Sequence, residues 1–143
     1  MRYSMQSGRI DESIGGLVMV EKVGFEAAVI SLTVDTSVRI AAFADSERDP
    51  QQFLVLQRAV SPTNEDQELG LDGLHLELGG QQQSAYGAVD GFKLSDQCLA
   101  IGLTEAAARR FGVDREVRVT LKVSEAEIDR IAAFLAQMLP LDR

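Results

Sequence analysis

The sequence predicts an α+β fold, in which a single domain is made mainly of an antiparallel, twisted sheet and two helices. Alternating apolar residues, which are typical of strands, dominate the front and middle of the chain, and helix signals cluster near its end. The 143 residues are enough for one core, because a chain of this size buries roughly 68–70% of the surface that its unfolded form exposes. The domain is therefore expected to span residues 1–143.

Strand-like patterns begin early in the chain. Residues 1–16 are polar and rich in glycine, and they are expected to form a frayed lead-in. Two β-rich stretches follow, Leu17–Val23 and Phe25–Val34, separated by Gly24, and Val38–Ala44 repeats the pattern. The residues that recur at period two, and are expected to share the apolar faces, are Ala28, Ile30, Leu32 and Val34, and then Val38, Ile40, Ala42 and Ala44.

The middle of the chain predicts one buried strand and one half-exposed strand. Phe53–Val60 is apolar at most positions, which indicates a central strand. Ser61–Gly73 holds a proline and most of the nearby carboxylates, so an acidic surface loop is expected at 61–73. Apolar and polar residues then alternate over Leu74–Leu78, which predicts a strand with His75 and Glu77 facing outward.

A hairpin is predicted next. A polar turn over residues 79–84 leads to the two apolar arms Tyr86–Leu94 and Cys98–Leu103. The apolar phase shifts at Gly91 in the first arm, and this shift predicts a β-bulge there.

Two helices are marked by their caps. Thr104 predicts an N-cap and Gly112 a glycine just past the last turn, so a short helix is expected at about 104–111. After a strand at 117–123, Ser124 begins an S-x-x-E capping box. Apolar residues at i, i+3 and i+4 then continue to a proline and predict an amphipathic helix at about 124–139.

The acidity of the chain is local. Of the net charge of −8, a charge of −6 arises between Arg58 and Lys93, where no Lys or Arg occurs. The carboxylates in this stretch are Glu65, Asp66, Glu68, Asp72, Glu77 and Asp90. Such a field steers basic partners and raises association rates by roughly 10 to 10³ at low salt. The alternative is a solvated segment that only keeps the protein soluble.

Composition also argues against several partners. Nucleic acid and anionic membranes both require clustered Lys and Arg, and the chain has no basic cluster beyond Arg109–Arg110. Cys98 is the only cysteine, so no internal disulfide forms, and the N-terminus lacks the apolar core of a secretory signal. A cytoplasmic protein is therefore expected.

No spacing of residues predicts a catalytic centre. The single histidine, His75, is expected on the surface, and Cys98 begins an apolar strand, where a buried filler is expected. Together they are too few for a typical zinc site. Phosphate-binding glycine loops and nucleophile elbows are absent from the sequence. A non-enzymatic protein without metal or cofactor is expected; the alternatives are an unrecognised carboxylate site and a cation bound in the segment Glu65–Asp72.

The residues expected to bind a partner protein combine this acidity with nearby polar and aromatic groups. Glutamine amides both donate and accept hydrogen bonds, which suits a polar interface, and a tyrosine supplies an anchor. The candidates are Glu65, Asp66, Glu68, Asp72, Glu77, Gln81, Gln82, Gln83 and Tyr86.

The stretch from Phe53 to Leu139 resembles the immunity protein 10 family of bacterial polymorphic-toxin systems. The resemblance is carried by Phe53-Leu54-Val55-Leu56-Gln57-Arg58, by Leu76-Glu77-Leu78 leading through Gln83 and Ser84 to Tyr86-Gly87, and by Leu99-Ala100-Ile101-Gly102-Leu103-Thr104 before the alanine-rich helix. It implies a small cytoplasmic protein that binds a cognate toxin domain and blocks it by occluding its active cleft. The local acidity suggests that the toxin is basic and nuclease-like. The alternative is an acidic secretion chaperone or adaptor, and a homodimer remains open.

Overall fold

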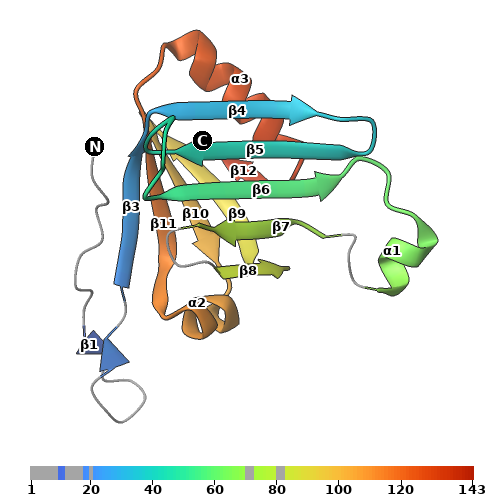
Figure 1. Cartoon of the computed structure of the whole chain (residues 1–143), viewed down its shortest axis with the longest axis horizontal. Helices are drawn as coiled ribbons and strands as arrows, with labels where there is room; N and C mark the ends of the chain where they lie inside the picture. The colour runs from blue at the N-terminus through green and yellow to red at the C-terminus, as the bar shows by residue number, and fades with distance from the viewer. Residues whose placement is uncertain (1–9, 12–17, 20, 70–72, 80–82) are drawn as a thin grey trace.

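The computed structural model describes residues 10–11, 18–19, 21–69, 73–79 and 83–143, and it is mostly β with helices at its margins (Figure 1). A small ribbon pairs β1 (Ile10–Asp11) with β2 (Val18–Met19). The larger strands form two five-stranded sheets, which we name the front sheet and the back sheet from their places in Figure 1. The prediction of one sheet is therefore wrong, although the α+β class with two main helices holds.

The front sheet is antiparallel throughout, in the order β4-β5-β6-β7-β8. Its strands are β4 (Val29–Val34), β5 (Val38–Ala44), β6 (Phe53–Ala59), β7 (His75–Leu78) and β8 (Gln83–Tyr86). β6 is the central strand, as its apolar composition predicted. The short helix α1 (Asn64–Glu68) lies in the connection from β6 to β7, where a loop was expected.

The back sheet is mixed, in the order β12-β9-β10-β11-β3. Its strands are β3 (Glu21–Ala27), β9 (Val89–Ser95), β10 (Cys98–Leu103), β11 (Val113–Leu121) and β12 (Leu141–Asp142). β3 pairs parallel to β11 and β12 parallel to β9, so the expected antiparallel pattern holds only in part. Parallel pairs join strands that are distant in sequence, and local patterns do not reveal them.

The core fills the space between the two sheets, whose strands cross steeply in Figure 1. Every second residue of the central strands points into it. The side chains that are fully buried there include Phe43, Leu54, Leu56, Leu76, Leu78, Leu99, Ile101, Leu103 and Leu121. The inward residues of β5 are thus Ala41 and Phe43, and not the predicted set that begins at Val38. β5 is apolar on both faces, so its periodicity could not identify the buried one.

Two predicted strands are each divided between the sheets. Phe25–Val34 breaks at Ala28, because β3 belongs to the back sheet and β4 to the front sheet, while Gly24 lies inside β3. Tyr86–Leu94 breaks at Gly87, whose φ of 67° lets the chain turn from β8 into β9. These crossings join the two layers.

The predicted bulge is confirmed. The β9–β10 register shifts after Gly91↔Gly102, since the next partners are Val89 and Leu103, and Asp90 is the extra residue. The Asp90 carboxylate turns toward Gly102: a Cβ placed on that glycine would lie 2.5 Å from Asp90 Oδ1. The glycine therefore makes room for the bulge.

The helices close the margins of the sandwich. α2 (Glu105–Phe111) begins at Thr104, whose hydroxyl accepts a bond from the Ala107 N–H, and it ends at Gly112 with φ 70°, both as predicted. α3 (Glu125–Ala136) begins at Ser124, whose hydroxyl accepts from the Glu127 N–H, and buries Ile128, Ile131, Ala132 and Leu135. It ends before the predicted 139, and the chain then turns through Met138 into β12.

Candidate protein-binding surface

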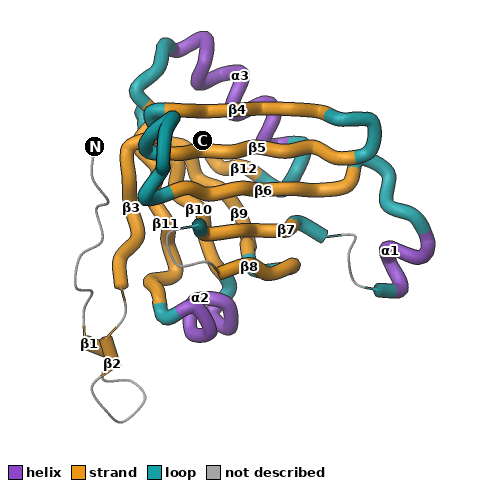
Figure 2. Tube along the Cα trace, viewed as in Figure 1, coloured by secondary structure: helices purple, strands orange, loops and turns teal. Residues whose placement is uncertain are grey.

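No described helix or strand covers the outer face of the front sheet. Figures 1 and 2 show it turned to the viewer, with the described helices beside or behind the sheet. Strand register places on this face one set of residues from each strand: Val29, Ser31 and Thr33; Val38, Ile40, Ala42 and Ala44; Phe53, Val55 and Gln57; His75 and Glu77; Ser84 and Tyr86. The centre of the face is apolar, and most of these central side chains are only half-buried.

A shallow hollow of about 320 Å³, which we call the outer groove, lies in the half of this face nearest the β5–β6 connection, where Pro50 also lines it. The side chains that line it include Val29, Ala42, Ala44, Phe53, Val55 and Glu77. Glu77 is the single carboxylate among the described positions on the face. Within the described residues, no Lys or Arg forms an ion pair with it. The groove therefore presents aliphatic and aromatic carbon beside the Ser31 hydroxyl and one unpaired carboxylate.

Phe53 is held in place by a glycine on the neighbouring strand. The Gly79 N–H donates to the Phe53 carbonyl at 2.9 Å, directly after the β6–β7 pairs. A Cβ added to Gly79 would lie 1.8 Å from Cε1 of the Phe53 ring, so the ring occupies the space of the missing side chain. This close packing gives the groove a firm aromatic wall.

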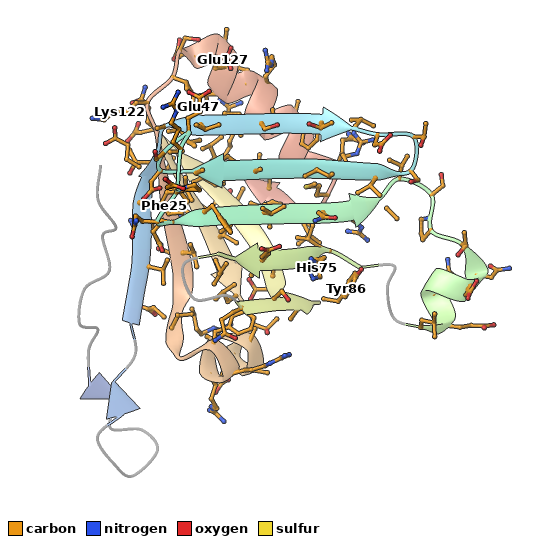
Figure 3. All side chains as sticks on the ribbon, viewed as in Figure 1. Phe25, Glu47, His75, Tyr86, Lys122 and Glu127 are labelled. Carbon is orange, nitrogen blue, oxygen red and sulfur yellow. The ribbon has the colours of Figure 1, made fainter. Side chains whose placement is uncertain are left out.

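An aromatic pair stands at the α1 end of the same face. His75 of β7 and Tyr86 of β8 are cross-strand partners, with ring centroids 4.7 Å apart and planes tilted by 58° (Figure 3). His75 faces outward with Glu77, as predicted, and Tyr86 is 45% exposed. Beside the pair lies a second hollow of about 330 Å³, lined also by Arg58, Ser61 and Thr63.

The predicted partner-binding residues do not form one patch. Glu65 and Glu68 are exposed on α1, which projects beyond the end of the front sheet (Figure 1), and Asp66 belongs to the same helix. Glu77 and Tyr86 share the outer face, whereas Gln83 pairs with Leu78 on the opposite side. Asp72, Gln81 and Gln82 lie outside the described residues.

Asp90 lies apart from the other described carboxylates of the acidic stretch. It lies in the back sheet, where its Oδ2 atom accepts a bond from Arg115 Nη2 at 3.4 Å. The described carboxylates of this run are therefore divided in space between α1, the front face and the back sheet.

Sequence reasoning missed the outer groove residues Val29, Ala42, Phe53 and Val55. A signal was present, because β5 and β6 are apolar on both faces except at Arg39, Gln57 and Arg58, whereas a strand with one solvent-facing side normally alternates. Such strands predict a sheet that is covered on both sides. In the described part of the chain only the inner side is covered.

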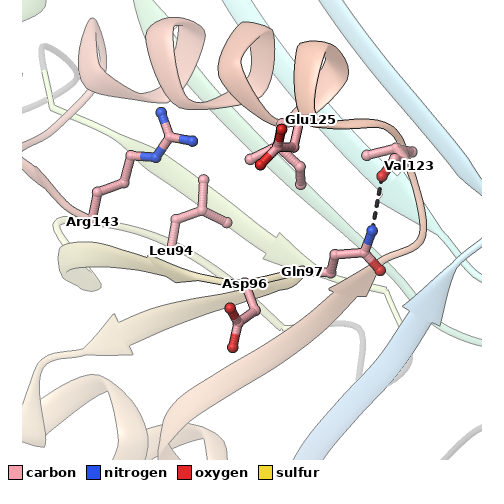
Figure 4. A pocket seen from close by; sticks show the side chains of 7 residues that line it. Leu94, Asp96, Gln97, Val123, Glu125 and Arg143 are labelled. Carbon is pink, nitrogen blue, oxygen red and sulfur yellow. Dashed lines mark hydrogen bonds between the residues drawn. The ribbon is translucent and has the colours of Figure 1, made fainter.

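A third hollow in the described part of the chain has a volume of about 420 Å³ (Figure 4). It opens between the β9–β10 turn and α3. Its polar groups already bond within the protein, since Gln97 Nε2 donates to the Val123 carbonyl at 2.8 Å and Arg143 pairs with Asp129 at 2.8 Å. Asp96 and Glu125 face it without a nucleophile or a histidine beside them. The hollow therefore lacks a Ser, Thr or Cys nucleophile with a histidine base beside it.

The other chemistry-bearing side chains lie apart. Cys98 is half-buried instead of fully buried, because its register with Ser95 and Thr120 turns it to the outer side of the back sheet. Within the described residues, no group of three His, Cys, Asp or Glu side chains could hold a metal ion. No helix in that part of the chain is both long and apolar enough to cross a membrane.

Asp45 and Gln52 are buried polar residues at the β5–β6 connection, and each is 2% exposed. The Asp45 N–H donates to the Gln52 carbonyl at 3.0 Å, and Asp45 Oδ1 accepts from the Gln51 N–H at 3.1 Å. Asp45 Oδ2 and Gln52 Oε1 have no hydrogen-bond partner among the described groups. Two oxygens are too few to hold a cation, so this pair is a local feature of the turn.

The sequence was also compared with known families and proteins. The family model described as Immunity protein 10 matches residues 25–129, which include the end of β3, strands β4 to β11, helices α1 and α2, and the start of α3. No curated protein and no solved structure shows significant similarity to the chain.

Proposed function

Because the chain belongs to the immunity protein 10 family, we propose that it binds a cognate bacterial toxin domain in the cytoplasm and neutralises it. It acts by occlusion, covering the active cleft of the toxin with a rigid surface, and catalyses no reaction itself. The acidity of this chain favours a basic toxin, because opposite charges attract. A nuclease fits that description, because a cleft that binds nucleic acid must be positive.

The exposed acids on α1 support the steering part of this proposal. The side chains of Glu65 and Glu68 stand in solvent on a helix that projects from the sheet, in a chain whose net charge is −8. Exposed charges act over a Debye length of about 8 Å at physiological salt, so they favour encounter more than they strengthen the final complex.

The open front face supports the occlusion part. A stable inhibitor requires an interface of roughly 1,200–2,000 Å² with a few dominant anchors. A broad sheet face with an apolar centre suits that need, and the described residues offer no comparable site for small-molecule chemistry.

Packing of the last helix weakens the alternative of a secretion chaperone. That alternative relies on an apolar face of the helix for dimerisation or partner binding. In α3 the apolar residues Ile128, Ile131 and Leu135 are buried in the protein's own core, so they are not free to take a partner.

Co-expression tests the proposal. The probe is a toxin domain taken from the C-terminal end of a secreted protein whose gene neighbours this one, expressed in a host whose growth that domain arrests. We expect the present chain to restore growth and to form a stoichiometric complex. Failure of the intact chain to restore growth, or turnover of a substrate by the purified chain alone, would overturn the proposal.

Stopped-flow association tests the steering. Reversing charge at Glu65 and Glu68 is expected to slow association about 10-fold at low salt and to lessen its salt dependence. The matched control reverses Glu105 and Glu125, which begin α2 and α3. Equal rates for the two double variants would refute steering by α1 even if inhibition is retained.

A further inference from the structure

We propose that the outer groove of the front sheet is the surface that docks the toxin domain, and that it receives an apolar side chain flanked by Lys or Arg. This inference rests on the proposed function and adds to it the location and chemistry of the contact. The acids of α1 then steer the partner, and the groove binds it.

The two outer faces of the sandwich differ in character. On the back sheet, β10 presents the uncharged Cys98, Ala100 and Gly102 outward, but charged side chains beside it pair with each other, such as Arg118 with Glu116 at 2.6 Å and Lys122, just past β11, with Glu26 at 3.3 Å. On the front sheet, the partner of Ala42 on β4 is the polar Ser31, but its outward neighbours on β5 and β6 are Ile40, Ala44, Phe53 and Val55. Solvent-facing strands do not need such residues, and an exposed apolar patch marks an interaction surface.

The Glu77 carboxylate indicates what kind of partner the groove binds. Glu77 stands at the groove without an ion-pair partner among the described residues, and register places no Lys or Arg on this face. A bound partner would partly desolvate this carboxylate, which is costly unless the partner supplies a cation. A second copy of this chain fits poorly, because a twofold contact would bring like charges together in a protein of net charge −8.

The groove is also preorganised. The Phe53 ring fills the space that a side chain on Gly79 would occupy, so its position is fixed by the strand beneath it. The paired rings of His75 and Tyr86 hold each other in place at the end of the face nearest α1. Aromatic groups held in this way lose little conformational entropy on binding, as dominant anchors require.

One substitution blocks the groove without changing charge. Ala42→Gln places a long side chain in its centre, on β5, and the matched control is Ala100→Gln. Ala100 is also a half-buried alanine that faces outward, on the central strand of the back sheet. Calorimetric titration with the toxin domain is expected to show binding at least about 10-fold weaker for Ala42→Gln and unchanged within about 2-fold for Ala100→Gln.

A second pair of variants tests whether the partner places a Lys or Arg beside Glu77. Glu77→Gln is expected to weaken binding about 10-fold and to reduce its salt dependence, whereas Glu125→Gln at the start of α3 leaves both unchanged. Thermal melts establish that each variant is folded, and Val55→Thr, which preserves side-chain shape, replaces Ala42→Gln if the latter does not fold.

The outcomes separate the two proposals. If the intact chain binds and inhibits the toxin but the groove variants match their controls, the groove is wrong and the function stands. If the intact chain does not bind the toxin, both proposals are wrong. If light scattering shows a dimer that Ala42→Gln dissociates, the groove binds a second copy and the toxin contact lies elsewhere.

Discussion

The ring of Phe53 lies where a side chain on Gly79 would have to stand, 1.8 Å from the position of the missing Cβ. The sequence predicts Gly79 as part of a polar turn. The structure gives it a second role, since the absence of a side chain lets an aromatic ring from the next strand lie flat on the sheet. The glycine thus shapes the face on which the toxin is proposed to dock.

Gly79→Ala should therefore force Phe53 from its place. We expect a loss of about 1–3 kcal/mol in the free energy of unfolding, as for an overpacked site, measured by urea denaturation. Gly73→Ala is the matched control, because a Cβ there meets no described atom within 4 Å. Equal stabilities of the two variants would show that the ring moves freely.

Arg58 ties β6 to the end of the chain. Its guanidinium donates to the main-chain carbonyl of Met138, just past α3, while Arg39 on the neighbouring strand lies 5.8 Å from the centre of the Phe134 ring. Met138 is 1% exposed, so little water can replace the lost donor.

Arg58→Met should lower the free energy of unfolding by about 1.5–3 kcal/mol, the range for a hydrogen bond to a charged group. Arg130→Met is the control, because Arg130 is 70% exposed in a 3.6 Å pair with Glu127, and such pairs contribute about 0–1 kcal/mol. Similar denaturation midpoints for both variants would contradict the assignment.

Gly112 ends α2 with a φ of 70°. Gly112→Ala should destabilise the protein by about 1–2 kcal/mol, because an L-residue with a Cβ is strained in the left-handed region. Gly112→Asn should cost less, since asparagine tolerates this conformation. Thermal unfolding that ranks the alanine variant at or above the asparagine variant would rule out backbone strain as the reason for the glycine.

Asp45 is buried, with 2% of its surface exposed, yet its Oδ2 atom has no hydrogen-bond partner among the described groups. Asp45→Asn should raise the melting temperature, because burying a neutral amide costs less than burying a carboxylate, and the remaining oxygen can still accept from Gln51. Glu47→Gln, an exposed change in the same connection, should leave it unchanged. A lower melting temperature for Asp45→Asn would contradict this and would indicate that the negative charge of Asp45 stabilises the fold.

The sequence by itself determined the local elements of this protein. Thr104, Gly112 and Ser124 mark helix ends through hydrogen bonds and backbone freedom that depend on nearby residues, and the bulge at Asp90 follows from a local change of phase. The resemblance carried by short strand and helix motifs also agrees with the family match over residues 25–129.

Only the tertiary structure decided how these elements are layered. The breaks at Ala28 and Gly87, which send neighbouring strands to different sheets, and the parallel pairing of β3 with β11 depend on contacts between distant segments. The same is true of the outer groove. Both faces of β5 are apolar, and which face is buried is set by the back sheet that packs against Ala41 and Phe43, leaving Ala42 outside. When both faces of a strand are largely apolar, its period-two pattern does not distinguish the buried face from the exposed one. The buried face can then be assigned only when the layer packed against it is known.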